Sequence, residues 1–234
     1  MADSWRRVSI VECDEPLLDL ARLGVQPILL RPRYYRMRIA DAIPQCLARE
    51  GVARLLMQAA AALPSGHRLV IWDAWRPQAV QEALYEAHYR DVARAHPELP
   101  AERIAALASR YVSRPSTDPC CPAPHTTGGA VDLTIADGSG SELPMGTDFD
   151  DFSRAARADH FDAPVRSGRR PSDIERTCRR NRRMLLEVMT AAGFTNYAEE
   201  WWHFDYGNQF WASERRCNAI YGMVHPGADL RRTA

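Results

Sequence analysis

Lysine is missing from this sequence, because all 30 basic residues among its 234 are arginines. The absence excludes P-loop lysines, Schiff-base lysines and lysine general bases. Net charge is missing too, since 30 acidic residues balance the arginines. We therefore expect no long-range attraction to nucleic acid or to anionic lipid. Eight arginines fall between residues 166 and 183, but acidic residues lie among them, so a solvated helix face is expected there.

Long hydrophobic runs are also absent. No stretch of eighteen apolar residues occurs, so no membrane span is expected. The first seven residues carry charges without a following apolar run, which predicts no secretory signal. Six scattered cysteines are too few for a disulfide scaffold at this length and suit reduced thiols. We expect a cytoplasmic protein, and the sequence leaves its oligomeric state open.

The length of 234 residues and the 46% apolar content suit one globular domain covering 1–234. Helical periodicity and capping signals predict three helices, at 45–62, 77–94 and 172–192. Apolar runs and alternation predict three strands, at 67–72, 130–135 and 194–206. Prolines and polar residues predict loops at 113–124 and 136–171. Helices gathered early, short strands and long loops indicate an α+β fold, with helices packed on a small antiparallel-rich sheet.

Two polar side chains stand out between residues 125 and 134. His125 falls in a loop before two glycines, and Asp132 falls in the strand that follows. Because strand residues alternate between faces, Val131 and Leu133 are expected on one face and Asp132 on the other. A carboxylate among apolar neighbours is costly to bury unless it is paired or binds metal.

The segment from Glu200 to His203 offers a potential base and a potential ligand within an aromatic stretch. Catalytic zinc takes three protein ligands and keeps one position for water. His125, Asp132 and His203 would supply one zinc ion per chain, which leaves Glu200 as the general base. Taken singly, each spacing is weak, and a structural core histidine is the better interpretation of either one.

Two further residues complete the candidate site. Arg76 follows a predicted strand in the motif Asp73-x-x-Arg76-Pro77, where its guanidinium could stabilise a developing oxyanion. Asp150 closes the segment 145–150, a loop whose carboxylate could meet an ammonium group.

Four blocks of sequence, taken together, resemble the zinc D-alanyl-D-alanine dipeptidases, which include vancomycin-resistance enzymes. The blocks are Trp72-Asp73-x-Trp75-Arg76-Pro77, His125-x-x-Gly128-x-Ala130-Val131-Asp132-Leu133-Thr134, Met145-Gly146-Thr147-x-Phe149-Asp150, and Gly193-Phe194-x-x-Tyr197-x-x-Glu200-Trp201-Trp202-His203. They fall in the order of the family and span well over half of the chain.

The resemblance implies a metalloprotease, and specifically a hydrolase of D-Ala-D-Ala or of a close relative in cell-wall metabolism. It implies zinc on His125, Asp132 and His203, Glu200 as base, and Arg76 as the group that stabilises the transition state. It further implies that Asp150 binds the free amino group of a small dipeptide. The implied fold is the one shared by D-Ala-D-Ala peptidases and the zinc domain of hedgehog proteins.

The sequence departs from the family at two places that touch the amino end of the substrate. Ala123-Pro124 stands where a serine usually precedes the first zinc histidine, and the nearest candidate for an early family tyrosine lies within 33–37. These departures leave open a zinc amidase that acts on another small amide. A zinc-binding module without catalysis is a third reading, although structural zinc would need neither Glu200 nor Arg76. Cys121, four residues before His125, is an alternative ligand.

Overall fold

A sheet of five strands, in the order β2-β4-β5-β7-β6, forms the centre of the molecule, and a second sheet pairs β1 with β3. The computed structural model describes residues 4–24 and 28–227. The strands of the central sheet are β2 (Ile28–Leu30), β4 (Arg68–Asp73), β5 (Ala130–Ala136), β6 (Thr195–Asn196) and β7 (His203–Asp205). Those of the small sheet are β1 (Leu17–Asp19) and β3 (Leu47–Arg49).

Neighbouring strands of the central sheet are mostly antiparallel. Only β2 and β4 run parallel, while β4–β5, β5–β7 and β6–β7 are antiparallel. The sheet is therefore antiparallel-rich, as predicted.

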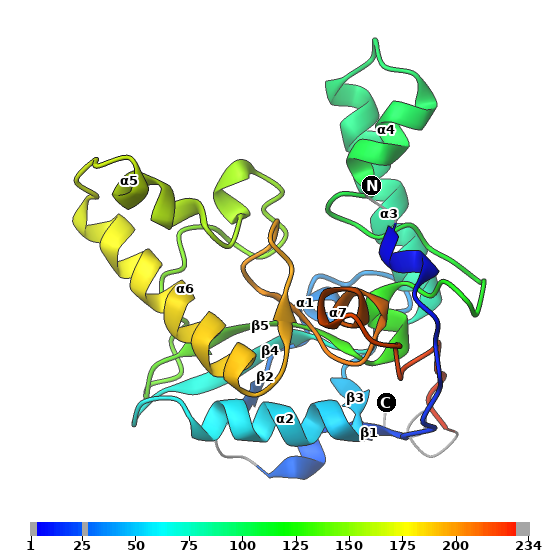
Figure 1. Ribbon diagram of the computed structural model, residues 1–234, viewed down its shortest axis with the longest axis horizontal. Coiled ribbons are helices and arrows are strands. Elements are labelled where there is room, and N and C mark those ends of the chain that lie inside the picture. Colours follow the sequence, from blue (N-terminus) through cyan, green and yellow to red (C-terminus); the bar gives the residue numbers. More distant parts are fainter. Residues whose placement is uncertain (1–3, 25–27, 228–234) are drawn as a thin grey trace.

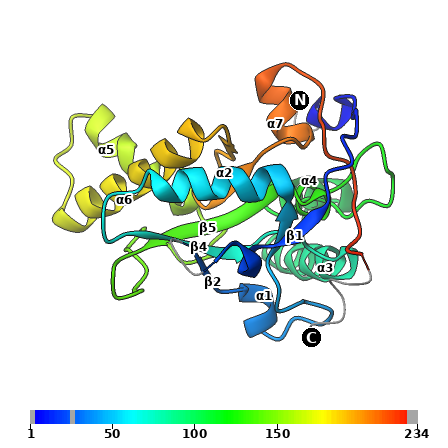
Figure 2. The same ribbon diagram turned by 90° about the horizontal axis from the view of Figure 1, so that it is seen from below.

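Helices cover both sides of the sheet, which confirms the predicted α+β class. In Figures 1 and 2, α2 and α6 lie on one face, and α1 and α3 lie on the other. The α-helices are α1 (Arg33–Arg36), α2 (Glu50–Ala61), α3 (Gln78–Ala95), α4 (Ala101–Ala108), α5 (Ala163–Arg166), α6 (Asp173–Ala191) and α7 (Gln209–Arg215). Short 3₁₀ helices are η1 (Ser4–Arg7), η2 (Leu20–Leu23), η3 (Pro124–Thr127), η4 (Arg154–Ala156) and η5 (His160–Asp162).

The main hydrophobic core fills the space between β5 and the helices α2 and α6. Val131, Leu133 and Ile135 are fully buried there together with Leu56 of α2 and Met189 of α6. Their alternation leaves Asp132 for the opposite face, as the strand pattern predicted. The apolar side chains of β5 thus hold the strand against the core, and Asp132 on the other face points to the candidate site.

The predicted helices are confirmed where capping and periodicity agree. The helix predicted at 172–192 is α6, whose Ser172 accepts a hydrogen bond from the Glu175 backbone in a capping box. The helix predicted at 77–94 is α3. The prediction at 45–62 was wrong at its start, because residues 47–49 form β3 and the helix begins at Glu50. Pairing with β1 overrides the helical propensity of these three residues.

The strand predicted at 194–206 was only partly right. Two short strands, β6 and β7, stand at its ends, and a turn carrying Glu200 connects them. The helix α4 was missed by the sequence analysis. Together α3, α4 and the residues up to 113, which we name the arm, project away from the sheet (Figure 1). Within the described ranges, no helix is long and apolar enough to cross a membrane.

Candidate metal centre and catalytic site

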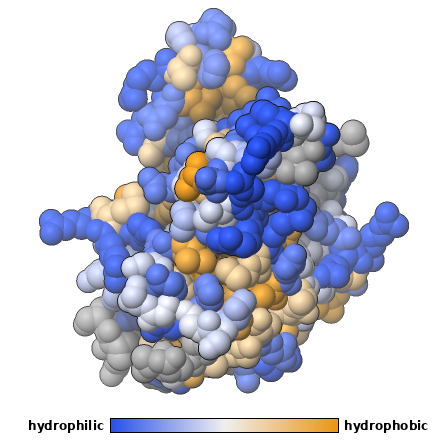
Figure 3. Space-filling view, turned by 90° about the vertical axis from the view of Figure 1, so that its left-hand side faces the viewer, coloured by the Kyte–Doolittle hydropathy of each residue, from blue (hydrophilic) through white to orange (hydrophobic). Residues whose placement is uncertain are grey.

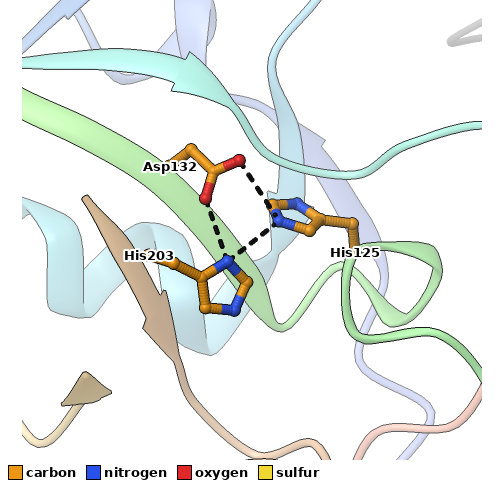
Figure 4. Close-up of side chains that lie close together, drawn as sticks. All are labelled: His125, Asp132 and His203. Atoms are coloured by element: carbon orange, nitrogen blue, oxygen red, sulfur yellow. Dashed lines mark hydrogen bonds and ion pairs between the residues drawn. The ribbon is translucent and has the colours of Figure 1, made fainter. Parts of the chain in front are cut away.

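Three side chains that lie far apart in the sequence converge at the face of the sheet opposite α2 and α6 (Figure 2). Ligand atoms of His125, Asp132 and His203 lie within 4.8 Å of one another, and all three residues are buried. Figure 4 shows the two rings and the carboxylate pointing toward a common point. Sequence reasoning selected these three residues, and the structure brings them together.

Strand register accounts for part of this convergence. Asp132 of β5 pairs with His203 of β7, so their side chains lie next to each other on one face. On its other side, Asp132 pairs with Asp73 of β4, next to an irregularity between Ile71 and Asp73. Bulges of this kind re-aim side chains beside active sites.

His125 reaches the site from η3, which ends directly before β5. The helix terminates at Gly128, whose φ of 71° lies in the left-handed region that glycine tolerates. A Cβ atom at this glycine would lie 2.6 Å from Cδ2 of Leu17, so a side chain here would require Leu17 to shift.

The outer hydrogen bonds of both histidines fix the direction of their lone pairs. Nδ1 of His125 donates to the carbonyl oxygen of Ala74 at 2.8 Å, so its Nε2 carries a lone pair. Nε2 of His203 donates to Oδ2 of Asp205 at 3.1 Å, so in the neutral ring Nδ1 carries the lone pair. Asp205 was not selected from the sequence, although its spacing of two from His203 in a strand places both on one face.

The two lone-pair nitrogens face each other at 3.2 Å, and each also faces the carboxylate of Asp132. Three electron-pair donors at one point repel one another unless a cation lies between them. Two imidazole nitrogens and one carboxylate oxygen are ligands that zinc prefers at a three-ligand site. The donor set therefore fits a zinc ion.

The charges around this point favour a cation as well. Burial alone would raise the pKa of Asp132, but His125 and His203 hold it below its usual range. Burial alone would lower the pKa of His203, yet Asp205 and Asp132 raise it. The site thus draws positive charge to the space between the rings and Asp132.

Glu200 lines the same cavity from the turn between β6 and β7. Burial raises the pKa of this carboxyl well above its usual range, and Asp132 and Asp150 add to the shift. None of the described residues donates a hydrogen bond to its buried Oε1. The neighbouring Glu199 differs, because its carboxylate pairs with Arg110 and Arg157. Of the two glutamates, only Glu200 has a free oxygen inside the cavity.

The buried guanidinium of Arg76 is held on two sides. Its Nε donates to Asp73 Oδ2 at 2.8 Å, and its Nη1 donates to Gln81 Oε1 at 2.7 Å. Nη2 lies 2.8 Å from Asp73 Oδ2 as well, and it makes longer contacts of 3.5 Å with Asp132 Oδ2 and with the Tyr34 hydroxyl. Arg76 is therefore fixed in place, and of its three nitrogens Nη2 is the one that also faces Asp132 and Tyr34.

Asp150 lies on the far side of Tyr34, whose hydroxyl donates to its Oδ1 at 3.3 Å. Its φ of 58° is left-handed, a conformation that aspartate tolerates better than most residues. Burial raises the pKa of Asp150 to about 7, and the charge of Asp132 adds to the shift. Tyr34 falls within the segment 33–37 that the sequence analysis named as the nearest tyrosine candidate, and it contacts both Asp150 and Arg76.

The metal cluster does not include Cys121, the alternative ligand. Its Sγ lies 3.9 Å from the backbone oxygen of Arg6, which is a weak contact outside the cluster. The arginines at 166–183 are mostly at the surface as expected, with one exception. Arg182 is buried and donates hydrogen bonds to the carbonyl oxygens of Met145, Ala155 and Arg157.

Comparison with known proteins adds sequence similarity to this geometry. Residues 36–220 match a family model described as D-ala-D-ala dipeptidase. A D-alanyl-D-alanine dipeptidase of Synechocystis sp. is 30% identical over 234 residues, which cover 94% of this chain and 90% of the relative. A D-alanyl-D-alanine dipeptidase of Escherichia coli is 31% identical over 159 residues, covering 68% of this chain and 65% of that protein.

Among solved structures, the chain is similar to a vancomycin resistance D,D-dipeptidase, VanXYg, in complex with a D-Ala-D-Ala phosphinate analog. The TM-score is 0.41 and the identity is 18%, with 93% of this chain and 71% of that chain covered. A likeness of this size is too weak to carry weight beside the sequence similarity.

Proposed function

The chain belongs to the D-ala-D-ala dipeptidase family, and from this premise we propose that it is a zinc-dependent dipeptidase that hydrolyses D-Ala-D-Ala or a closely related small dipeptide. The observation that carries the proposal is the convergence of three lone-pair donors beside the free oxygen of Glu200. The amidase and the non-catalytic module that the sequence left open have no support among the relatives. We further propose that residues 1–234 act as one zinc peptidase domain.

Each residue of the site has a proposed role. His125, Asp132 and His203 would hold the zinc ion, one per chain. When bound, zinc supplies a Lewis acid that polarises the scissile carbonyl, acidifies the attacking water and offsets the negative charge of the site.

Glu200 takes the proton from the attacking water through its unpartnered Oε1 and later returns it to the leaving amine. Arg76 uses the second N–H of Nη2 to stabilise the oxygen of the scissile carbonyl as negative charge develops there. Because Asp73 and Gln81 hold the guanidinium in place before substrate arrives, no reorganisation is needed during the reaction.

Asp150 pairs with the ammonium group of the substrate in this proposal. A charge-assisted hydrogen bond of this kind requires a free amino end, so N-acetylated dipeptides should be cleaved far more slowly than free ones. Equal rates for the two would remove Asp150 from that role.

The decisive experiment compares two neighbouring glutamates. The zinc-loaded protein is incubated with D-Ala-D-Ala, and released D-alanine is measured. Glu200→Gln should keep its zinc and lose roughly two to four orders of magnitude in turnover, because only the base is removed. Glu199→Gln, the neighbouring control, should lose far less turnover, since the Glu199 carboxylate pairs with Arg110 and Arg157 and does not act as the base. Substantial turnover in a zinc-replete Glu200→Gln protein would place the base elsewhere.

Metal analysis tests the ligands independently of activity. His125→Ala, Asp132→Ala and His203→Ala should each lose stoichiometric zinc. Full zinc content in all three variants would overturn the ligand assignment.

A further inference from the structure

The cavity that contains the site is larger than two alanyl residues require. Its volume is about 910 Å³, toward the upper end of the range for pockets that enclose drug-sized ligands. The cavity extends from the metal-binding residues to the arm, where Leu84, His88 and Tyr111 line it together with Phe152 of the loop before η4. In Figure 3 the arm is the lobe at the top, and apolar surface is visible on it.

One face of α3 forms a continuous wall of this cavity. Gln81, Leu84 and His88 all line it, and their spacings of three and four residues place them on one side of the helix. The wall begins next to Arg76, whose guanidinium donates a hydrogen bond to Gln81. A helix rises 1.5 Å per residue, so His88 lies about 10 Å beyond Gln81.

The far end of the wall is aromatic. The ring of Phe152 lies 4.5 Å from that of His88 and 5.3 Å from that of Tyr111, measured between centroids. Burial lowers the pKa of His88, which keeps the ring neutral. Its buried Nε2 has no hydrogen-bond partner among the residues that the structure describes. A further aromatic ring could pack against these three rings in edge-to-face or offset-stacked contacts.

Several hydrogen bonds fix this wall relative to the catalytic groups. Gln81 donates to the carbonyl oxygen of Ser113 at 2.6 Å, which joins α3 to the end of the arm. The hydroxyl of Tyr197 donates to the carbonyl oxygen of Arg110 at 2.6 Å, and Arg110 pairs with Glu199 beside the base. These bonds therefore join both ends of the arm to the elements that carry the catalytic groups.

On the proposed function, the position of this wall identifies which part of a substrate it meets. An ammonium group at Asp150 and a scissile carbonyl at Arg76 place the first residue of a dipeptide between these two side chains. Phe152 follows Asp150 by two residues, and Gln81 contacts Arg76. We infer that the aromatic end of the cavity is a subsite for a large aromatic side chain on the first residue of the substrate.

The test is a comparison of substrates within each protein. Values of kcat/KM are measured for D-Ala-D-Ala and for D-Phe-D-Ala with the zinc-loaded enzyme. We expect D-Phe-D-Ala to be preferred by roughly tenfold or more, because burying a phenyl ring exceeds the gain from burying a methyl group. Equal values, or a preference for D-Ala-D-Ala, would overturn the inference.

Variants assign the preference to the subsite. Phe152→Ala and His88→Ala should each reduce the ratio of the two kcat/KM values severalfold. Tyr89→Ala is the matched control, because Tyr89 lies on the same helix, packs against Tyr85 and does not line this cavity. A loss of folded protein lowers both kcat/KM values together and cancels in the ratio. An unchanged ratio in both subsite variants would contradict the inference.

The proposed function and the subsite can fail separately. If neither dipeptide is cleaved, the proposed function fails, and calorimetric binding of the two dipeptides then decides the subsite. Tighter binding of D-Phe-D-Ala, lost in Phe152→Ala, supports the subsite, while equal binding refutes it.

Discussion

At the scale of single residues, the orientation of each histidine depends on an acceptor outside the metal cluster. Asp205 holds Nε2 of His203, and the carbonyl of Ala74 holds Nδ1 of His125. The Asp205 carboxylate is itself fixed, because the side chain of Asn208 donates to its Oδ1 at 2.5 Å. Only side-chain replacement at Asp205 can test this arrangement, since the other acceptor belongs to the backbone.

Asp205→Asn should weaken zinc binding by about ten- to a hundredfold, because the ring of His203 loses its charged acceptor. The affinity is measured by competition with a chelator. Asp137→Asn is the control, because Asp137 caps an exposed turn. Equal affinities in the two variants would mean that Asp205 does not orient the ligand.

The titration of Asp150 should shape the acidic limb of the profile of kcat/KM against pH. Its carboxyl has a pKa of about 7, raised by burial and by Asp132. Below that pH the group is protonated and neutral, so it attracts the substrate ammonium less strongly. We expect kcat/KM to rise with pH through about 7 for this reason.

Asp150→Asn should remove the part of this limb that titrates near 7 and lower kcat/KM at pH 8 by roughly ten- to a hundredfold, the loss of a hydrogen bond to a charged group. Asp148→Asn, at an exposed position two residues earlier, should leave the profile unchanged. An acidic limb that persists in Asp150→Asn belongs to another group.

At the scale of elements, the junction between η3 and β5 fixes the position of His125. Gly128 combines a left-handed φ of 71° with a close approach to Leu17. Gly66 is also left-handed, with a φ of 81°, but no atom lies within 4 Å of the place where its Cβ would stand. Alanine at Gly66 therefore adds backbone strain alone, whereas alanine at Gly128 adds strain and a steric clash.

Gly66→Ala should cost only the strain, about 1 kcal/mol, and Gly128→Ala should cost about 1–3 kcal/mol more. Each kcal/mol lowers Tm by about 2–4 °C for a chain of this length. Thermal unfolding measures both. Equal shifts in Tm would show that Leu17 moves aside without cost.

Elements with several agreeing signals were predictable from the sequence. The capping box and periodicity identified α6, and the alternation of Val131, Leu133 and Ile135 identified β5. The strand β3 was not predictable, because its three residues are helix formers whose conformation is set by pairing with β1. The turn inside 194–206 was also missed, since the aromatic run masks the interruption that places Glu200 in the cavity.

At the scale of the whole molecule, His125, Asp132 and His203 could be predicted because four blocks of sequence together resemble one family. No single spacing would have identified them. The sequence did not select Asp205 or Gln81, which act by holding a chosen residue. Nor could it indicate the size of the cavity, because the arm that lines it approaches Asp150 only in the folded chain.

Zinc should stabilise the whole molecule, because its three ligands come from separate segments that unfolding would scatter. At a free zinc concentration one hundred times Kd, the gain is about 2.7 kcal/mol. That gain corresponds to a rise in Tm of about 5–10 °C. Scanning calorimetry with and without zinc measures it, and His203→Ala should show no rise. A similar rise in that variant would indicate that zinc binds elsewhere.

The pairing of Asp132 with His203 across β5 and β7 also makes zinc a reporter of folding. A slip of one residue between these strands would turn Asp132 toward the opposite face. A chain with misaligned strands then lacks the complete ligand set, however compact it has become. The time course of zinc uptake during refolding should therefore follow the correct alignment of the two strands and lag behind collapse.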